Sequence, residues 1–307
     1  MDMKSTWQKA VAPWAGAWAV AVGACLVWAG PVMAAEPRWV QVPGVQRLLL
    51  GEVEVLALSD RRFVIDAQRL SGVVQQDWPA ALARSFKTDP ALRGVTAYAL
   101  RKGASVVLID AGRGAREGED FGQVAENLKQ AGIAPDEVSA VFLTNLHADR
   151  VGGLLDAASQ RQFKNARLFA SPQAMRHWLT DHHYVRAPDA QKVAFATTIA
   201  SVMGYVKSGR LQPVDEGVSL MPGLSVLPVP GQAPGSVAYL IESQGQALLI
   251  VGDRAATSDA AWRKTLAAAA RRNRIVAASH WPFPGFARIR AQAGGALRHE
   301  PLPMASN

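Results

Sequence analysis

Three apolar runs of the sequence end in polar loops that carry histidine or aspartate. The loops are Thr144–Arg150, Gly252–Asp253 and His280–Pro282, and the side chains in them that could do chemistry are His147, Asp149, Asp253 and His280. Loops at strand ends bring together side chains from distant segments. Imidazole and carboxylate groups bind divalent metals and move protons. One such residue alone is usually a surface or capping residue, but three loops of this kind predict a shared site.

Other candidate residues carry weaker signals. The loop Pro230–Gly235 lies between these strands in the chain and contains Gln232. Trp281 and Phe283 follow His280, and we predict that they form either an apolar wall for a substrate or part of the core. His177, His182 and His183 fall in a predicted helix and the loop after it, where surface histidines are the simpler interpretation and a substrate mouth is the alternative. Ser236 lacks the glycine that would follow a nucleophile elbow.

These loops need strands that bring them to one edge of a sheet. Residues that favour extended structure predict strands at Arg47–Asp60, Arg62–Ile65, Val138–Leu143, Ala166–Phe169, Gly223–Val229 and Ile275–Ala278, with hairpins at Val95–Ile109 and Val237–Val251. Helical periodicity and helix-start prolines predict helices at Trp78–Ser85, Phe121–Ala131, Pro172–Leu179, Pro188–Val206 and Ala260–Arg271. Hairpins and helices mix in both halves, which predicts an α/β fold of two mixed sheets flanked by helices in four layers.

Composition limits the classes of protein to which the chain could belong. The 307 residues are 49% hydrophobic and 19% charged, which excludes a wholly disordered chain. The net charge is +8, and the basic residues are scattered, with short clusters such as Arg271–Arg274. This pattern is typical of a solvated basic surface and predicts no nucleic-acid partner. No Pro, Gly or Ser-rich linker divides residues 36–307, so we predict a single domain, with no signal for an oligomeric state.

The first 35 residues have the pattern of a secretory signal peptide. Lys4 and Lys9 precede the uncharged run Val11–Trp28, and small residues follow near Ala34 and Ala35, after either of which cleavage is expected. A retained membrane anchor is one alternative, and lipidation at Cys25 is another. We therefore predict a periplasmic or secreted protein with no stable membrane insertion after cleavage. Cys25 is the only cysteine, so the mature chain would contain no disulfide.

The loops resemble those of the metallo-β-lactamase superfamily. In that family a His-x-His-x-Asp-His motif, followed by Gly-Gly, stands at the end of an apolar strand, and here the corresponding stretch is Asn145–Gly153. The resemblance extends from about Leu48 to Ile289. Within the superfamily, the chain is most similar to the methyl parathion hydrolase-like branch. The segments that carry the branch resemblance are Leu50–Val55, Leu58–Asp60, Val107–Gly112, Ala238–Gly245 and His280–Gly285. It implies an αββα sandwich and an exported zinc-dependent hydrolase of ester-like bonds.

Three of the seven metal-ligand positions implied by the resemblance are changed. Asn145, Arg150 and Gln232 stand where histidines are expected. One implied metal site therefore keeps only His147. The other keeps three ligands, which are Asp149, Asp253 and His280. Because an amide is a poorer zinc ligand than an imidazole, we predict at most one tightly bound zinc ion per chain, with none as the alternative.

Two interpretations follow from these changes. In the first, the chain is a metal-poor or non-catalytic protein that binds a small-molecule ligand, and Arg150 pairs with Asp149 and Asp253 in place of a metal. In the second, it is a slow single-zinc hydrolase of an ester, lactone, phosphotriester or amide. The loop Asn145–Arg150 is similar to that of the mononuclear carbapenem-hydrolysing lactamases, in which the arginine is not a ligand. His147, Asp149 and Arg150 would then be catalytic, with His147 as a general base.

Overall fold

The computed structural model describes residues 44–61, 95–118, 120–215, 219–229, 233–252 and 260–302. Several predictions of the sequence analysis lie outside these residues. They are the signal peptide with Cys25, the strand at Arg62–Ile65, the helix at Trp78–Ser85, and the two candidate site residues Gln232 and Asp253.

The first sheet has seven strands that follow one another in chain order. Its first four strands are antiparallel and the remaining three run parallel to the fourth. The strands are β1 (Val45–Leu50), β2 (Val53–Ser59), β3 (Thr96–Lys102), β4 (Ser105–Ile109), β5 (Val138–Phe142), β6 (Arg167–Ala170) and β7 (Leu211–Pro213). The parallel strands place the loops after β4, β5 and β6 at one edge.

The single strand predicted over Arg47–Asp60 is wrong, because β1 and β2 form a hairpin. The chain reverses at Gly51, whose φ is 58°. Glycine adopts this left-handed conformation at little cost. A Cβ at Gly51 would also lie 2.5 Å from the Ser243 hydroxyl. A glycine within an apolar run therefore marked a turn rather than an interruption of one strand.

The second sheet also has seven strands, in the order β14-β13-β12-β11-β10-β9-β8. They are β8 (Ser219–Met221), β9 (Leu224–Pro228), β10 (Val237–Ser243), β11 (Gln246–Val251), β12 (Ile275–Ala278), β13 (Phe286–Ala291) and β14 (Leu297–Pro301). The predicted hairpin is β10–β11, and β12 pairs in parallel with β11. The strands β7, β8, β13 and β14 were not predicted.

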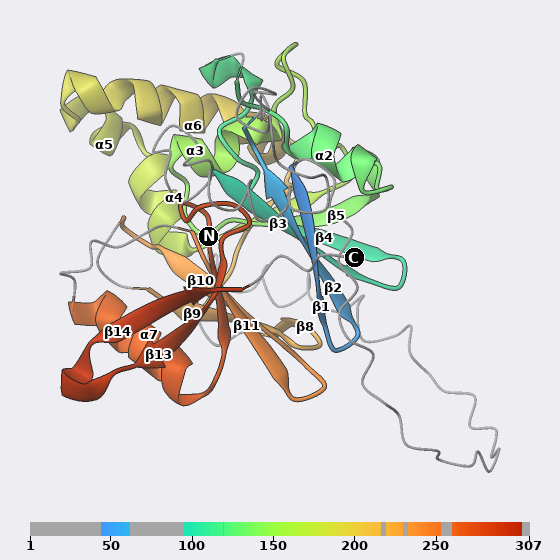
Figure 1. Cartoon of the computed structure of the whole chain (residues 1–307). Helices are drawn as coiled ribbons and strands as arrows, with labels where there is room; N and C mark the ends of the chain where they lie inside the picture. The colour runs from blue at the N-terminus through green and yellow to red at the C-terminus, as the bar shows by residue number, and fades with distance from the viewer. Residues whose placement is uncertain are drawn as a thin grey trace, which may run out of the picture. The chain divides into compact units, whose positions relative to one another are not determined.

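Helices cover the outer faces of both sheets, as Figure 1 shows. They are α2 (Val124–Gln130), α3 (Ala148–Val151), α4 (Pro172–Trp178), α5 (Asp181–Arg186), α6 (Asp189–Lys207) and α7 (Ala260–Arg271). The backbone of His182 and His183 is helical, so their predicted loop is wrong. None of the helices in the described part of the chain has the length and apolar character needed to span a bilayer.

Three hydrophobic clusters separate the four layers. One cluster packs the first sheet against helices such as α2 and α6, with Leu128 and Val202 among its members. A second fills the space between the sheets and includes Val107 and Tyr239. A third packs the second sheet against α7 through residues such as Trp262. The predicted αββα architecture is confirmed.

Hydrogen bonds join the loops of the two sheets at the edge where the candidate residues lie. The Tyr239 hydroxyl on β10 donates to the carbonyl oxygen of Leu143 at 3.0 Å. Nearby, the Val237 N–H donates to the carbonyl of Thr144 at 2.8 Å. The loop after β5 is therefore fixed to the second sheet as well as to its own.

Candidate functional site

The loop after β5 is shaped by Asn145. This side chain is buried, and its Oδ1 accepts a hydrogen bond from the His147 N–H at 2.8 Å. His147 then occupies the position before α3, where its carbonyl accepts from the Arg150 N–H. A short side-chain amide can bond the backbone two residues later, as it does in Asx turns. Asn145 thus has a structural role, because this bond fixes the backbone that carries the His147 and Asp149 side chains.

Asp149 is the centre of the candidate site. Its Oδ1 lies 2.9 Å from His147 Nδ1, and its Oδ2 lies 3.0 Å from Nε2 of His280, which follows β12 in the other sheet. Burial alone would raise the pKa of Asp149, but the Arg150 guanidinium and the two histidine contacts hold it well below its usual range. The structure therefore brings together His147, Asp149 and His280, and Asp149 stays ionised.

Arg150 is completely buried beside this carboxylate. Its Nη2 lies 3.7 Å from Asp149 Oδ2, and its Nε lies 3.7 Å from Oδ2 of Asp110. The predicted pairing with Asp149 is present, whereas the predicted partner Asp253 lies outside the described residues. Sequence reasoning missed Asp110 as a site residue and considered it as part of Val107–Gly112, a segment that carries the family resemblance. Its position directly after the buried strand β4 was the available signal.

Asp110 is fixed by hydrogen bonds from the loop after β5. Its carboxylate accepts hydrogen bonds from the N–H and the hydroxyl of Thr144 at 2.8 and 2.7 Å. Burial raises the pKa of Asp110 to about 6, and the opposing effects of Arg150 and Thr144 limit the rise. The backbone of Asp110 has a φ of 59°, a conformation that aspartate tolerates better than most residues. These bonds tie the loops after β4 and β5 together beneath the site.

A second buried carboxylate supports the loop after β4. Asp60, at the end of β2, accepts hydrogen bonds from the N–H groups of Arg113, Gly114 and Gly122 at 2.7, 3.1 and 3.1 Å. Burial raises its pKa to about 7 although these bonds favour the charged form. The same loop lies so close to Gly152 that a Cβ there would be 1.7 Å from the Arg113 carbonyl oxygen. Glycine at 152 is therefore required by close backbone approach.

An aromatic cluster lies beside His147. The rings of His147 and Trp178 meet edge to face with their centroids 5.6 Å apart, and Trp178 packs on Phe195 at 4.6 Å. Trp281 and Phe283, the predicted substrate-wall residues, are each 8% exposed and belong to different hydrophobic clusters on opposite faces of the second sheet. This placement favours the core alternative for Trp281 and Phe283 and indicates Trp178 as the aromatic neighbour of the site.

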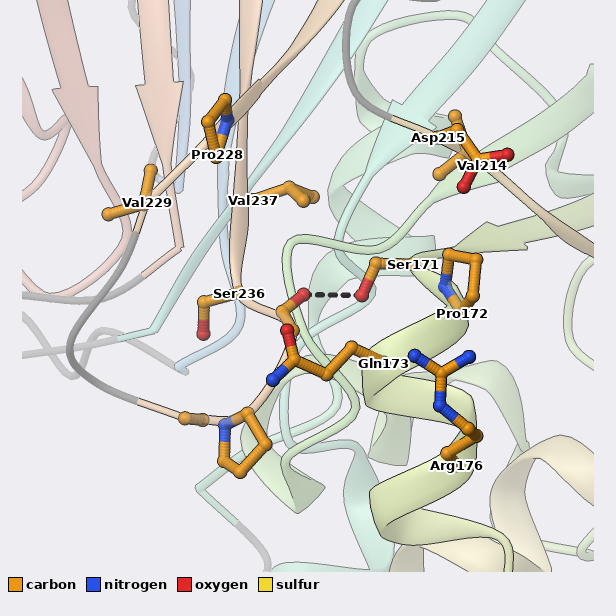
Figure 2. Close-up of a pocket in the computed structure, with 13 residues that line it drawn as sticks. Ser171, Pro172, Gln173, Arg176, Val214, Asp215, Pro228, Val229, Ser236 and Val237 are labelled. Atoms are coloured by element: carbon orange, nitrogen blue, oxygen red, sulfur yellow. Dashed lines mark hydrogen bonds between the residues drawn. The ribbon is translucent and has the colours of Figure 1, made fainter.

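A cleft of about 740 Å³ opens beside this edge, between α4 and the strands β7, β9 and β10. Figure 2 shows its lining, including the hydrogen bond from the Ser171 hydroxyl to the Gly235 carbonyl. Three of its residues, Val229, Ser236 and Val237, also line a much smaller cavity that reaches Asn145. The rim carries the exposed side chains of Arg176 and Asp215. Both polar and apolar surfaces are thus available to a small molecule next to the loop after β5.

The site offers donor groups of the kinds that bind divalent metals, but the described residues do not arrange three of them around one ion. His147, Asp149 and His280 offer imidazole and carboxylate donors of the kinds that zinc binds. Among residues 44–302, apart from the undescribed gaps, no group of three His, Cys, Asp or Glu side chains is spaced to hold a metal ion. The Arg150 guanidinium already lies beside the Asp149 carboxylate, so its positive charge would repel a metal ion at that carboxylate.

Comparisons with known proteins identify the fold of this chain. The family model described as the metallo-beta-lactamase superfamily matches residues 91–285. A search among curated proteins gave no match. Among solved structures, the hydrolase AbOPH of the beta-lactamase superfamily is 23% identical, with a TM-score of 0.70, and the alignment covers 85% of this chain and 98% of that one.

Two further structures share the architecture. AidC, a dizinc quorum-quenching lactonase in complex with its product, is 20% identical with a TM-score of 0.67, over 84% of this chain and 97% of that one. A probable metal-dependent hydrolase from Staphylococcus aureus is 15% identical with a TM-score of 0.57, over 84% and 99%. At these identities the likeness concerns the fold.

Proposed function

The chain belongs to the metallo-beta-lactamase superfamily, and from this premise we propose that it is a metal-poor derivative of a zinc hydrolase that binds a small molecule beside Asp149. The observation that carries the proposal is the buried Arg150 guanidinium between Asp149 and Asp110. A fixed cation at this point offsets buried carboxylates that would otherwise need a metal ion. We further propose that the chain derives from the methyl parathion hydrolase-like branch and is exported after removal of residues 1–35.

Asn145 supports the same proposal. Its amide oxygen is committed to the His147 N–H, and the side chain is buried. It therefore serves the loop rather than a metal ion. Together with the substitution at position 232, this leaves His147 as the sole imidazole of one ligand set.

A slow single-zinc hydrolase is the second candidate, and the contacts among His147, Asp149 and His280 favour it. One zinc ion held by Asp149, His280 and Asp253 would supply an activated water and polarise an ester, lactone, phosphotriester or amide carbonyl or phosphoryl group. His147 Nδ1 contacts Asp149, which directs Nε2 away from that carboxylate. Nε2 is the atom that would accept a proton from water, with Asp149 fixing the ring as carboxylates do in catalytic dyads. Arg150 would hold Asp149 in place.

Metal analysis of natively purified protein tests the main proposal. We expect at most one zinc ion per chain, and two at full occupancy would overturn it. N-terminal sequencing of the same material tests export, because an intact Met1 in the exported protein would contradict cleavage.

Assays on a panel of esters, lactones and phosphotriesters separate the two candidates. If the protein is a hydrolase, Asp253→Ala should abolish its activity. The triple change Asn145→His, Arg150→His and Gln232→His should create or raise activity if only the ligands have been lost. Activity that survives both Asp253→Ala and chelation would place the chemistry elsewhere.

A further inference from the structure

Net positive charge is concentrated in the C-terminal part of the chain, because this part has few acidic residues. The whole sequence has 33 Lys and Arg against 25 Asp and Glu. Residues 260–302 contain eight of the basic residues and a single acidic residue, Glu300. These residues form α7, β12, β13 and β14, and α7 packs against both β13 and β14. Residues 260–302 therefore carry a net charge of +7 (8 − 1), of which α7 and the turn after it hold a large part.

Three arginines lie together on the strand pair β13–β14, and we call them the arginine stripe: Arg288, Arg290 and Arg298. Arg290 is directly opposite Arg298 across the pair, and Arg288 is opposite Glu300. Ala287 and Ile289, the alternate residues of β13, face α7. Side chains alternate between the faces of a strand, so the stripe lies on the face of this pair that is turned away from α7.

The stripe has more positive charge than its own acid can neutralise. Glu300 lies 3.4 Å from Arg290 and 3.7 Å from Arg298, so two guanidinium groups share one carboxylate. Like charges that face each other across a strand pair destabilise it. Arg288 donates to the main-chain and side-chain oxygens of Asn273, which are neutral. An external anion would relieve this repulsion.

The chemistry of the stripe fits phosphate groups. Arginine binds phosphate through two parallel N–H donors, and it is the preferred residue for this anion. The phenylalanine and tryptophan side chains of the same region are buried, namely Trp262, Trp281, Phe283 and Phe286. Bases of single-stranded nucleic acid would need such rings for stacking, whereas lipid headgroups need only the charge.

We propose that the arginine stripe docks the protein on anionic phospholipid surfaces. Clusters of basic side chains bind such surfaces additively and reversibly, and salt weakens the binding. This inference is independent of the proposed function, since the stripe and the Asp149 site belong to different segments. Docking would hold the protein at a membrane without inserting any part of the described fold.

Vesicle sedimentation tests the proposal with the purified protein. We expect it to bind vesicles with about 30% phosphatidylglycerol at least about tenfold more tightly than pure phosphatidylcholine vesicles. Salt at about 0.5 M should release it. Equal binding to both kinds of vesicle that salt does not weaken would assign the binding to the uncharged run Val11–Trp28 and overturn the proposal.

Matched variants locate the binding surface. The variant Arg288→Gln, Arg290→Gln and Arg298→Gln should lose about tenfold in affinity or more. A control with the same loss of charge changes three exposed residues elsewhere, Lys164→Gln, Arg167→Gln and Lys207→Gln, and should bind as the original protein does. Equal losses in both variants would show that only net charge matters and would overturn the proposal.

Two further measurements test whether the stripe binds lipid phosphate in particular. Glu300→Gln removes the acid that competes with phosphate, so it should tighten binding to anionic vesicles; unchanged or weaker binding would contradict the role of the stripe. A DNA duplex serves as the competing polyanion. Tighter binding to the duplex than to the vesicles would assign the stripe to nucleic acid and overturn the proposal.

Discussion

Replacing Arg150 by methionine should strongly destabilise the fold. Methionine fills much of the same volume without charge, so the main effect is to leave the carboxylates of Asp149 and Asp110 without their cation. Arg150 is 0% exposed, and the side chains of Asp110 and Asp149 are 1% and 14% exposed. Removing one partner of a buried ion pair costs about 3–5 kcal/mol, because the remaining charge is left uncompensated. For a chain of this size that corresponds to a fall in Tm of about 6–20 °C.

Thermal and urea unfolding, each with a chelator present, would measure this loss. The exposed Arg167→Met provides the control and should change the free energy of unfolding by less than about 0.5 kcal/mol. Adding Asp110→Asn to Arg150→Met should recover part of the loss, because the unpaired carboxylate is then neutral. The double-mutant cycle should give a coupling of about 1–3 kcal/mol. If Arg150→Met lowers stability no more than Arg167→Met does, the guanidinium does not stabilise these carboxylates and the reasoning fails.

Three further predictions concern the supports of the site. Burial raises the pKa of Asp60 to about 7, so the folded state binds this proton more tightly than the unfolded state does. The free energy of unfolding should therefore fall as pH rises from about 4 to about 7. Urea unfolding of Asp60→Asn should lack this part of the pH dependence, and a dependence identical to that of the original protein would contradict the prediction. Gly152→Ala should prevent accumulation of soluble folded protein, since the new Cβ would overlap the Arg113 carbonyl. Gly132→Ala has open space around it and bears only the strain of its φ of 79°, so it should remain folded by circular dichroism. Tyr239→Phe should lower the free energy of unfolding by about 1–3 kcal/mol in urea titration, because a buried carbonyl loses its donor, and a change within error would show that the bond to the other sheet is dispensable.

The sequence predicted the parts of the fold that have a clear local pattern. The hairpins at Val95–Ile109 and Val237–Val251 have two β-rich runs around a short polar turn, and both are present as β3–β4 and β10–β11. The strands β13 and β14 have no such pattern, because β14 alternates only weakly and carries several charged residues. They form a hairpin around Gly294 and Gly295 that packs against α7, and the weak alternation of β14 hid this local signal.

The candidate site was predictable only in part for a similar reason. His147, Asp149 and His280 were found because each follows an apolar strand, and the fold does bring them together. Asp110 follows a strand as well, but it was considered as part of Val107–Gly112, a segment that carries the family resemblance, rather than as a site residue. Only the paired ends of β4 and β5 show that it faces Arg150.

The hydrogen bonds between the two sheets have a consequence for the order in which the chain folds. The bond from Tyr239 to Leu143 joins residues 96 positions apart, and the bond from Tyr98 to Pro284 joins residues 186 apart. Closing such long loops costs entropy that is recovered only when both sheets are in contact. The hairpins should therefore form early and the His147–Asp149–His280 cluster last, so folding intermediates would have much of the native sheet structure and no binding site.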